Sequence, residues 1–266
     1  MRVSAKSVIV ELLSAGPIIG DSIPVRQLVR AAQAFDIAEN SVRVAIVRLR
    51  ADGIVESSER GHYQLGPAAR PVDERVKRWR DAEAQMCPWD GSWLAAFTAD
   101  LPRTDRPALR KRARALKLMG FRELKPGLAI RPANLVGSLD DHRNRLLRLG
   151  LDPNATVFRI ADLGSTNDEA ARGLWDVRAM RAVYADMADQ LDAMTDSFAS
   201  MPIESVIRES FLLGREAIRW IVLDPLLPEP LVPADERRRL LDAMKRFDEG
   251  ARVYWRKYMA DLANEA

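Results

Sequence analysis

One stretch near the start of the chain constrains the fold more than any other. Between residues 38 and 50, apolar side chains recur at i, i+3, i+4 and i+7, the spacing of one face of an α-helix: Val42, Ala45, Ile46 and Leu49. Polar and charged residues occupy most of the other positions. Gly53 predicts the end of this helix, because glycine adopts the left-handed conformation of a helix cap without strain.

A two-stranded ribbon is predicted directly after this helix. Residues 54–57 and 62–65 have strand character, and the polar segment 58–61 between them predicts a turn. Two further short helices are expected upstream, over 7–13 and from residue 23 onward. Three helices and a ribbon within about 65 residues are typical of a winged helix-turn-helix, whose last helix enters the major groove of DNA. An amphipathic helix before a hairpin also occurs in ordinary folds, so the upstream helices decide the interpretation.

Ten residues of the last helix and the ribbon are candidates for DNA contact. Arg43, near the start of the helix, is expected to contact guanine, and Val44 and Val47 to touch thymine methyl groups. Arg48 and Arg50 are expected to bind phosphates, with a salt bridge to a nearby carboxylate as the alternative. The complete set is Asn40, Ser41, Arg43, Val44, Val47, Arg48, Arg50, Arg60, Gly61 and His62. For His62, a plain strand position is the alternative.

Charge is distributed unevenly along the 266 residues, which carry a net charge of +3. Residues 1–66 hold 8 Lys/Arg and 7 Asp/Glu, for a net +1; residues 67–135 hold 15 and 8, for +7; residues 136–266 hold 18 and 23, for −5. Phosphates attract Lys and Arg through the release of counterions. We therefore expect DNA to meet the first half and the acidic half to face solvent or a partner subunit.

Several classes of protein are excluded or disfavoured. Cys87 is the only cysteine, which excludes an intrachain disulfide and a cysteine-based zinc site. No apolar stretch approaches the about 20 residues that span a bilayer, and the first residues do not form a signal-peptide core. His62 and His142 are the only histidines, and neither a phosphate loop nor a nucleophile elbow occurs. A cytoplasmic protein without cofactor, metal or enzymatic activity is expected.

In the remaining chain, strands and helices are expected to alternate first, and helices alone are expected to follow. A proline-containing linker over 66–71 precedes a charged helix over 72–85. Strands and helices then alternate: strand 93–97, helix 107–119, strand 128–130, helix 140–149 and strand 156–160. This order suggests a ferredoxin-like α+β module. From residue 167 the pattern is almost all helix, with breaks at Pro202 and across 224–233.

These elements predict an α+β chain in four parts. They are a winged helix-turn-helix over 1–66, a linker and connecting helix over 67–88, a ferredoxin-like domain over 89–165, and a helical domain over 166–266.

The sequence resembles the PaaX-type repressors of phenylacetate degradation over nearly its whole length. The matching segments are Asn40–Leu49 with Asp52-Gly53; Trp93–Phe97, Arg110–Leu116, Gly120-Phe121, Pro126-Gly127 and Arg131-Pro132; and Leu174–Asp176, Tyr184, Arg219-Trp220 and Asp224–Pro233. The resemblance implies a dimeric winged-helix repressor with a ferredoxin-like middle domain and a helical C-terminal domain. The ferredoxin-like module by itself also resembles the small CRISPR-associated Cas2 nucleases, so it is called Cas2-like. It also implies control of an aromatic-acid catabolic cluster and release from the operator by an aromatic acyl-CoA such as phenylacetyl-CoA.

Two departures from the family pattern concern the effector. The family often carries Trp-Pro-Gly after the position of Pro233, where this chain has Ala234–Arg237. An aromatic residue is common near the position of Leu128-Ala129, and none occurs here.

Candidates for effector binding lie in the middle and C-terminal parts: Arg110, Arg114, Trp175, Arg219 and Trp220. The first two belong to the most basic stretch, 103–125, whose cations would bind the phosphates of CoA or DNA beside the operator. A solvated helix face is the alternative for this stretch, a core position for each tryptophan, and an ion pair with Asp224 for Arg219.

Two other functions stay open from the sequence. A metal-dependent nuclease on the Cas2-like module would need a carboxylate at the end of strand 93–97. The strand itself carries none, and the nearest candidate is Asp100, three residues beyond its end. A protein-interaction scaffold with secondary DNA binding would use the helical C-terminal part instead.

Overall fold

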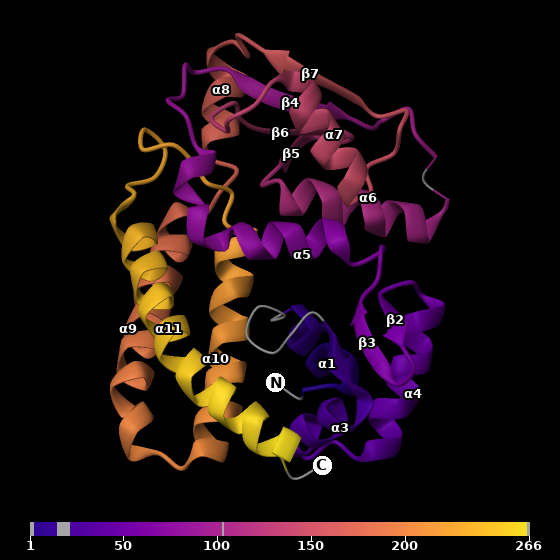
Figure 1. Cartoon of the computed structure of the whole chain (residues 1–266). Helices are drawn as coiled ribbons and strands as arrows, with labels where there is room; N and C mark the ends of the chain where they lie inside the picture. Colours follow the sequence, from indigo (N-terminus) through magenta and orange to yellow (C-terminus); the bar gives the residue numbers. More distant parts are fainter. Residues whose placement is uncertain (1–2, 15–21, 103, 265–266) are drawn as a thin grey trace. The chain divides into compact units, whose positions relative to one another are not determined.

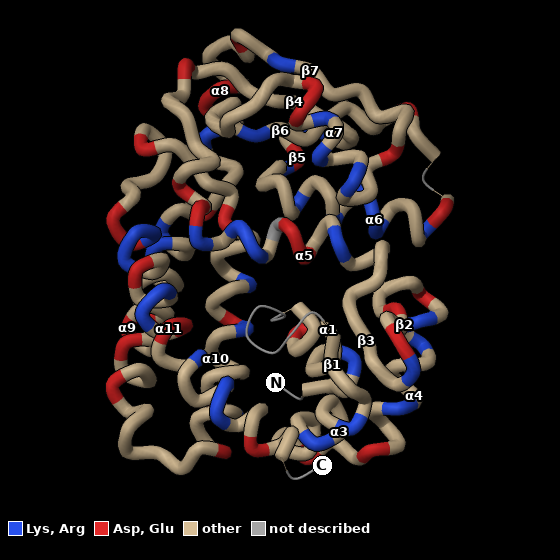
Figure 2. The backbone as a smooth tube through the Cα atoms, in the orientation of Figure 1, with Lys and Arg blue, Asp and Glu red and all other residues tan. Residues whose placement is uncertain are grey.

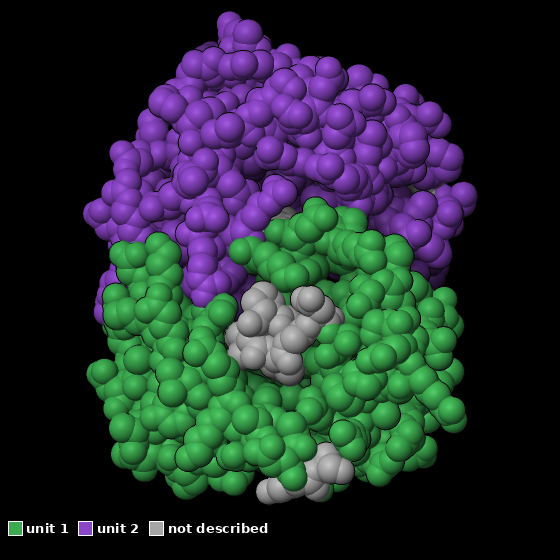
Figure 3. All heavy atoms as spheres, in the orientation of Figure 1, with its two compact units in different colours: residues 1–77, 189–217, 242–266 green, residues 78–188, 218–241 purple. Residues whose placement is uncertain are grey.

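The computed structural model describes residues 3–14, 22–102 and 104–264. The chain forms two compact units, each assembled from separate segments (Figure 3). Unit 1 comprises residues 1–77, 189–217 and 242–266, and unit 2 comprises residues 78–188 and 218–241. The sequence prediction kept 166–266 in one helical domain, whereas the contacts divide these residues between both units.

Unit 1 begins with three helices and a small antiparallel sheet (Figure 1). The helices are α1 (Ala5–Ser14), α3 (Val25–Gln33) and α4 (Glu39–Ala51), and the strands are β1 (Ile23–Pro24), β2 (Val55–Glu59) and β3 (His62–Leu65). The strand order is β1-β3-β2. The three predicted helices and the ribbon are confirmed, but β2 extends to Glu59, so the turn shortens to Arg60-Gly61.

The buried face of α4 explains why this helix forms where it does. Val42, Ile46 and Leu49 are buried at 0%, 3% and 0% exposure, as their spacing predicts. Gly53 follows with φ 66°. The N–H of Ile54 then donates to the carbonyl of Leu49 at 2.9 Å, which closes the last turn of the helix.

Two C-terminal helices complete the core of unit 1. They are α10 (Ile203–Leu223) and α11 (Asp235–Asn264), joined to the N-terminal helices through Phe211, Trp255 and Met259. The ring of Phe211 lies 4.6 Å from that of Phe35. Met259 is 6% exposed within the same cluster. The apolar faces of the N-terminal helices are therefore buried against α10 and α11 as well as against one another.

The connecting segment departs from the prediction. The single charged helix expected over 72–85 is wrong: α5 (Arg70–Lys77) is followed by two 3-10 turns, η1 (Arg78–Asp81) and η2 (Glu83–Gln85). These turns bury Trp79 at 5% exposure, and the guanidinium of Arg80 stacks 4.5 Å from its ring.

Unit 2 contains a four-stranded antiparallel sheet of order β5-β6-β4-β7. Its elements are β4 (Trp93–Phe97), α6 (Arg106–Leu118), β5 (Arg122–Lys125), β6 (Leu128–Pro132), α7 (Leu139–Leu149) and β7 (Thr156–Ile160). The three predicted strands and two predicted helices are confirmed. β5 was missed because its charged residues continue the basic run from α6. Charged side chains are common on edge strands such as β5, where they discourage pairing with other chains.

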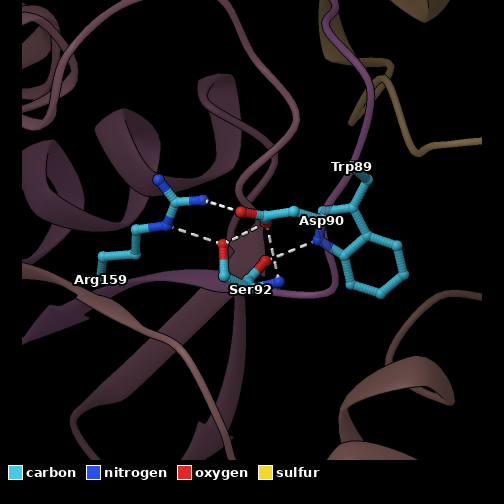
Figure 4. A network of polar contacts seen from close by, with 4 residues as sticks. All are labelled: Trp89, Asp90, Ser92 and Arg159. Atoms are coloured by element: carbon cyan, nitrogen blue, oxygen red, sulfur yellow. Dashed lines mark hydrogen bonds and ion pairs between the residues drawn. The ribbon is translucent and has the colours of Figure 1, made fainter.

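A polar network fixes the entry into β4 (Figure 4). From β7, Arg159 donates its Nε–H to the hydroxyl of Ser92 at 2.7 Å and pairs with the carboxylate of Asp90. Hydrogen bonds from Ser92, and then the charge of Arg159, hold the pKa of Asp90 below its usual range. The indole of Trp89 donates to the carbonyl of Ser92 at 2.6 Å. These contacts hold the first strand against the edge strand β7.

One face of this sheet is covered by C-terminal residues. Helix α8 (Ser165–Arg172) supplies Asp168, which accepts the indole N–H of Trp93 at 3.0 Å. Trp175, beyond α8, stacks on Trp93 at 6.3 Å with an interplanar angle of 9°. Helix α9 (Val177–Ser197) and the 3-10 turn η3 (Phe198–Ser200) follow. The mixed α+β class is confirmed. Within the described ranges, no helix is both long and apolar enough to cross a membrane.

Candidate nucleic-acid interface

The solvent face of α4 carries all seven of its predicted contact residues. Every one is exposed: Asn40, Ser41, Arg43, Val44, Val47, Arg48 and Arg50. Val44 is 41% exposed and Val47 is 67% exposed, opposite the buried stripe of the same helix. In Figure 2 the blue segments of this helix are its arginines. The structure thus brings these seven residues together on one surface.

Helical geometry arranges them in rows, because successive residues turn by about 100°. Asn40, Val44 and Val47 form the row that points most directly away from Val42, Ile46 and Leu49. Arg43 and Arg50 lie on one side of this row. Ser41 and Arg48 lie on the other side. An uncharged row is therefore flanked by cations.

Arg43 is held by a neighbour that the sequence analysis missed. Its Nε and Nη2 lie 2.8 Å and 2.7 Å from Oε1 of Glu39, one turn earlier. Both side chains are more than half exposed, and such exposed i,i+4 pairs contribute only about 0.3–0.5 kcal/mol. A base or phosphate can therefore replace Glu39 as the partner of Arg43. The i,i+4 spacing of opposite charges was the signal available in the sequence.

Arg48 and Arg50 have no such partner among the described residues. Within the described part of the chain, neither forms a hydrogen bond or an ion pair through its side chain. The salt bridge weighed as an alternative for these two arginines does not form there.

The turn between β2 and β3 is built by Arg60 and Gly61. Gly61 has φ 79°, and its carbonyl accepts the N–H of Val25 at 2.8 Å. Nδ1 of His62 lies 3.4 Å from the carboxylate of Glu59 and 3.4 Å from the carbonyl of Arg60. Arg60 is exposed, whereas His62 is half-buried and turned toward its neighbours. The strand β2 itself carries acidic residues (Figure 2).

The predicted effector residues are spread over several elements. Arg110 and Arg114 are exposed on α6, and Arg219 and Trp220 are exposed on α10. Trp175 is 5% exposed in the core beside Trp93, and its indole nitrogen has no hydrogen-bond partner among the residues that the structure describes. Among the described residues, no hydrogen bond, ion pair or ring contact joins any two of these five.

The basic stretch 103–125 does not form one continuous exposed face. Arg112 is 6% exposed, and its Nε lies 2.8 Å from the carboxylate of Asp152. The helical part ends at Leu118, and Arg103 lies outside the described residues. Only part of the basic run is therefore free to meet an anion.

Asp224 does not serve as the partner of Arg219. It is 5% exposed and accepts the N–H of Leu226 at 2.7 Å. Burial raises the pKa of Asp224, opposed chiefly by the charge of Arg237; a hydrogen bond with Tyr184 adds to this opposition. Arg219 stays exposed.

Comparison with known proteins bears on this surface directly. The family model described as "PaaX-like protein" matches residues 4–69, which contain α4 and the ribbon. The Transcriptional repressor PaaX of Escherichia coli (strain K12) is 24% identical over 226 residues, which cover 81% of this chain and 69% of the relative. Together, these matches support membership of the PaaX family.

The fold of this chain has a counterpart among solved structures. The Uncharacterized protein Rv0674 from Mycobacterium tuberculosis has a TM-score of 0.54 and 21% sequence identity, and the match covers 95% of this chain and 99% of that one. At this level of identity the likeness shows the fold alone.

Proposed function

We propose that this chain is a DNA-binding transcriptional repressor of the PaaX type whose helix α4 enters the major groove. The observation that carries the proposal is the exposed face of α4, with three arginines around an uncharged row, inside the segment that matches the family model. Arg43 would contact a guanine, and Arg48 and Arg50 would hold phosphates. Arg60, Gly61 and His62 would approach the backbone from the ribbon.

Two domain assignments support this function. The helices α1, α3 and α4 with the sheet β1-β3-β2 have the order of a winged helix-turn-helix. In unit 2, the element order β-α-β-β-α-β and the strand order β5-β6-β4-β7 are those expected of a ferredoxin-like, Cas2-like module. The proposal keeps the predicted boundaries: 1–66 for the winged helix-turn-helix, 67–88 for the linker and connecting helix, and 89–165 for the ferredoxin-like domain.

The proposed effector is an aromatic acyl-CoA, as the family resemblance implies, and the proposed target is an aromatic-acid catabolic cluster. Arg110 and Arg114 are exposed one turn apart on α6, so both can reach one phosphate-bearing ligand. Arg219 and Trp220 offer a second exposed cation and an aromatic ring. Trp175 would take part only if the packing around Trp93 opens.

The repressor would act as a homodimer. One helix reads only a short half-site, and two-fold symmetry of the protein matches a palindromic operator. Sedimentation of the full-length chain at micromolar concentration is expected to show a dimer. A monomer under these conditions would remove this part of the proposal.

The direct test uses full-length protein and a pool of duplex DNA with a randomised central segment. A repressor of this type is expected to enrich a short palindromic sequence and to leave the DNA intact when Mg²⁺ or Mn²⁺ is added. Metal-dependent cleavage would favour the nuclease alternative, which the comparisons do not favour. Failure to retain duplex DNA at low salt would contradict the proposal and favour the interaction scaffold.

A further inference from the structure

The uncharged row of α4 contains two unusual side chains. Val44 and Val47 are exposed at 41% and 67%. Within the described residues of unit 1, the only other large apolar side chain exposed to this degree is Val253 of α11, at 62%. Scattered exposed apolar residues are ordinary, but these two lie one turn apart in the same row.

Neither core packing nor helix stability accounts for these valines. Their side chains point away from the buried stripe that Val42, Ile46 and Leu49 supply. A β-branched residue also restricts its own side chain in a helix, so alanine would stabilise α4 better at both positions. The chemistry of a partner is the remaining explanation for a valine at each position.

The surroundings indicate what that partner is. Arg50 on one side of the row, and Arg48 on the other, match the phosphates that border a groove, while Arg43 is assigned to a guanine. The floor between them must then offer apolar groups to two valines. In the major groove, the C5 methyl group of thymine is the apolar group that a base presents. Asn40, at the start of the same row, has the amide that pairs with the N6 and N7 edge of adenine.

We propose that α4 reads a half-site rich in A·T pairs, with Val44 and Val47 against thymine methyl groups and Asn40 on an adjacent adenine. This inference rests on the proposed function and specifies the class of DNA sequence that it recognises. Arg48 and Arg50 then supply position and affinity, and Arg43 reads a guanine. The row Asn40, Val44 and Val47 supplies discrimination among A·T-containing sequences.

The test replaces thymine by uracil, which removes the methyl group and leaves the hydrogen-bonding edges unchanged. The probe is the duplex enriched by the full-length protein from the randomised pool, with each thymine replaced singly. At one or two positions per half-site, binding is expected to weaken by about fourfold for each methyl group lost. Thymines outside the contacted segment serve as internal controls.

A variant links this effect to the two valines. Val44→Ala/Val47→Ala is expected to bind the thymine and uracil duplexes equally, because the side chains that contact the methyl groups are shortened. Val253→Ala, a matched exposed valine of the same unit, is expected to keep the full wild-type difference. Circular dichroism is expected to show an intact fold, since alanine favours helix and both sites are exposed.

Each outcome decides the inference. If the wild type binds the enriched duplex but no uracil substitution weakens binding by more than twofold, the inference is wrong and the proposed function stands. If Val44→Ala/Val47→Ala keeps the wild-type sensitivity to uracil, other residues read the methyl groups and the inference is wrong. If no duplex is retained at all, the proposed function fails first.

Discussion

Glu11 on α1 and Arg215 on α10 form an ion pair of 2.9 Å between segments far apart in the sequence. Burial raises the pKa of Glu11 to about 7 from its ordinary value of 4.5, and the charge of Arg215 opposes this shift only in part. The pair therefore places a carboxyl group whose charged form is disfavoured by burial where a C-terminal helix meets the N-terminal helices of unit 1.

The free energy of unfolding is expected to fall as the pH rises from about 4.5 to about 7. Over this range the folded state keeps a proton on Glu11 that the unfolded state has released, so deprotonation favours unfolding. Glu11→Gln should remove this slope and raise stability at pH 8 by about 1–2 kcal/mol, after allowance for solvent screening of a partly exposed group. Urea titrations at several pH values measure it. Glu249→Gln, at an exposed position of the same unit, is the control, and an unchanged slope in Glu11→Gln would refute the assignment.

Met259→Ala is expected to destabilise unit 1 by about 2–4 kcal/mol, because it removes a buried side chain from the core shared with the N-terminal helices. Val253→Ala, an exposed position on the same helix, should change stability by less than about 0.5 kcal/mol. Chemical denaturation of both variants measures the difference. Equal stabilities would show that α11 does not contribute to this core.

Arg43→Ala is expected to weaken binding to the enriched duplex by about 1–3 kcal/mol and to leave nonspecific binding nearly unchanged. Fluorescence anisotropy with the enriched duplex and a scrambled duplex separates the two effects. Glu39→Gln removes the ion pair but keeps the guanidinium, so it should change specific binding much less. An equal loss for both duplexes in Arg43→Ala would make Arg43 a phosphate contact.

Arg110→Ala/Arg114→Ala is expected to raise the dissociation constant of an aromatic acyl-CoA while leaving that of the matching free acid unchanged. The phosphates of CoA need cations, and both arginines are exposed on α6. Calorimetric titration of free CoA, the acyl-CoA and the free acid measures this. Arg256→Ala/Lys257→Ala removes the same charge from an exposed part of α11 and should have little effect. An acyl-CoA bound equally by all variants would exclude the phosphate role of α6.

The sequence pattern predicted those helices and strands whose formation depends on residues close together in the chain. The spacing of Val42, Ile46 and Leu49 and the position of Gly53 sufficed for α4, because one helix face and one cap depend on neighbours in the sequence. The pair Glu39–Arg43 was equally local and was available from its spacing.

Features that depend on distant partners were not predictable in this way. The strand β1 exists because Ile23 pairs with Tyr63 across the sheet, and nothing in its two residues signals that pairing. Arg112 reads as one more cation of a basic run, yet Asp152 holds it in the core. The contribution of Met259 to the N-terminal core likewise depends on the packing of α11 against helices that lie about 200 residues earlier in the sequence.

The salt dependence of DNA binding tests the central claim most directly. The logarithm of the association constant for duplex DNA is measured against the logarithm of the salt concentration, for the wild type and for Arg43→Ala/Arg48→Ala/Arg50→Ala. If the face of α4 meets DNA, the wild type should show a steep negative slope, and the variant should lose about one unit of slope for each phosphate contact removed. Arg256→Ala/Lys257→Ala, on α11, should keep the wild-type slope. A variant with the wild-type slope and affinity would contradict the assignment of α4 as the DNA-binding helix.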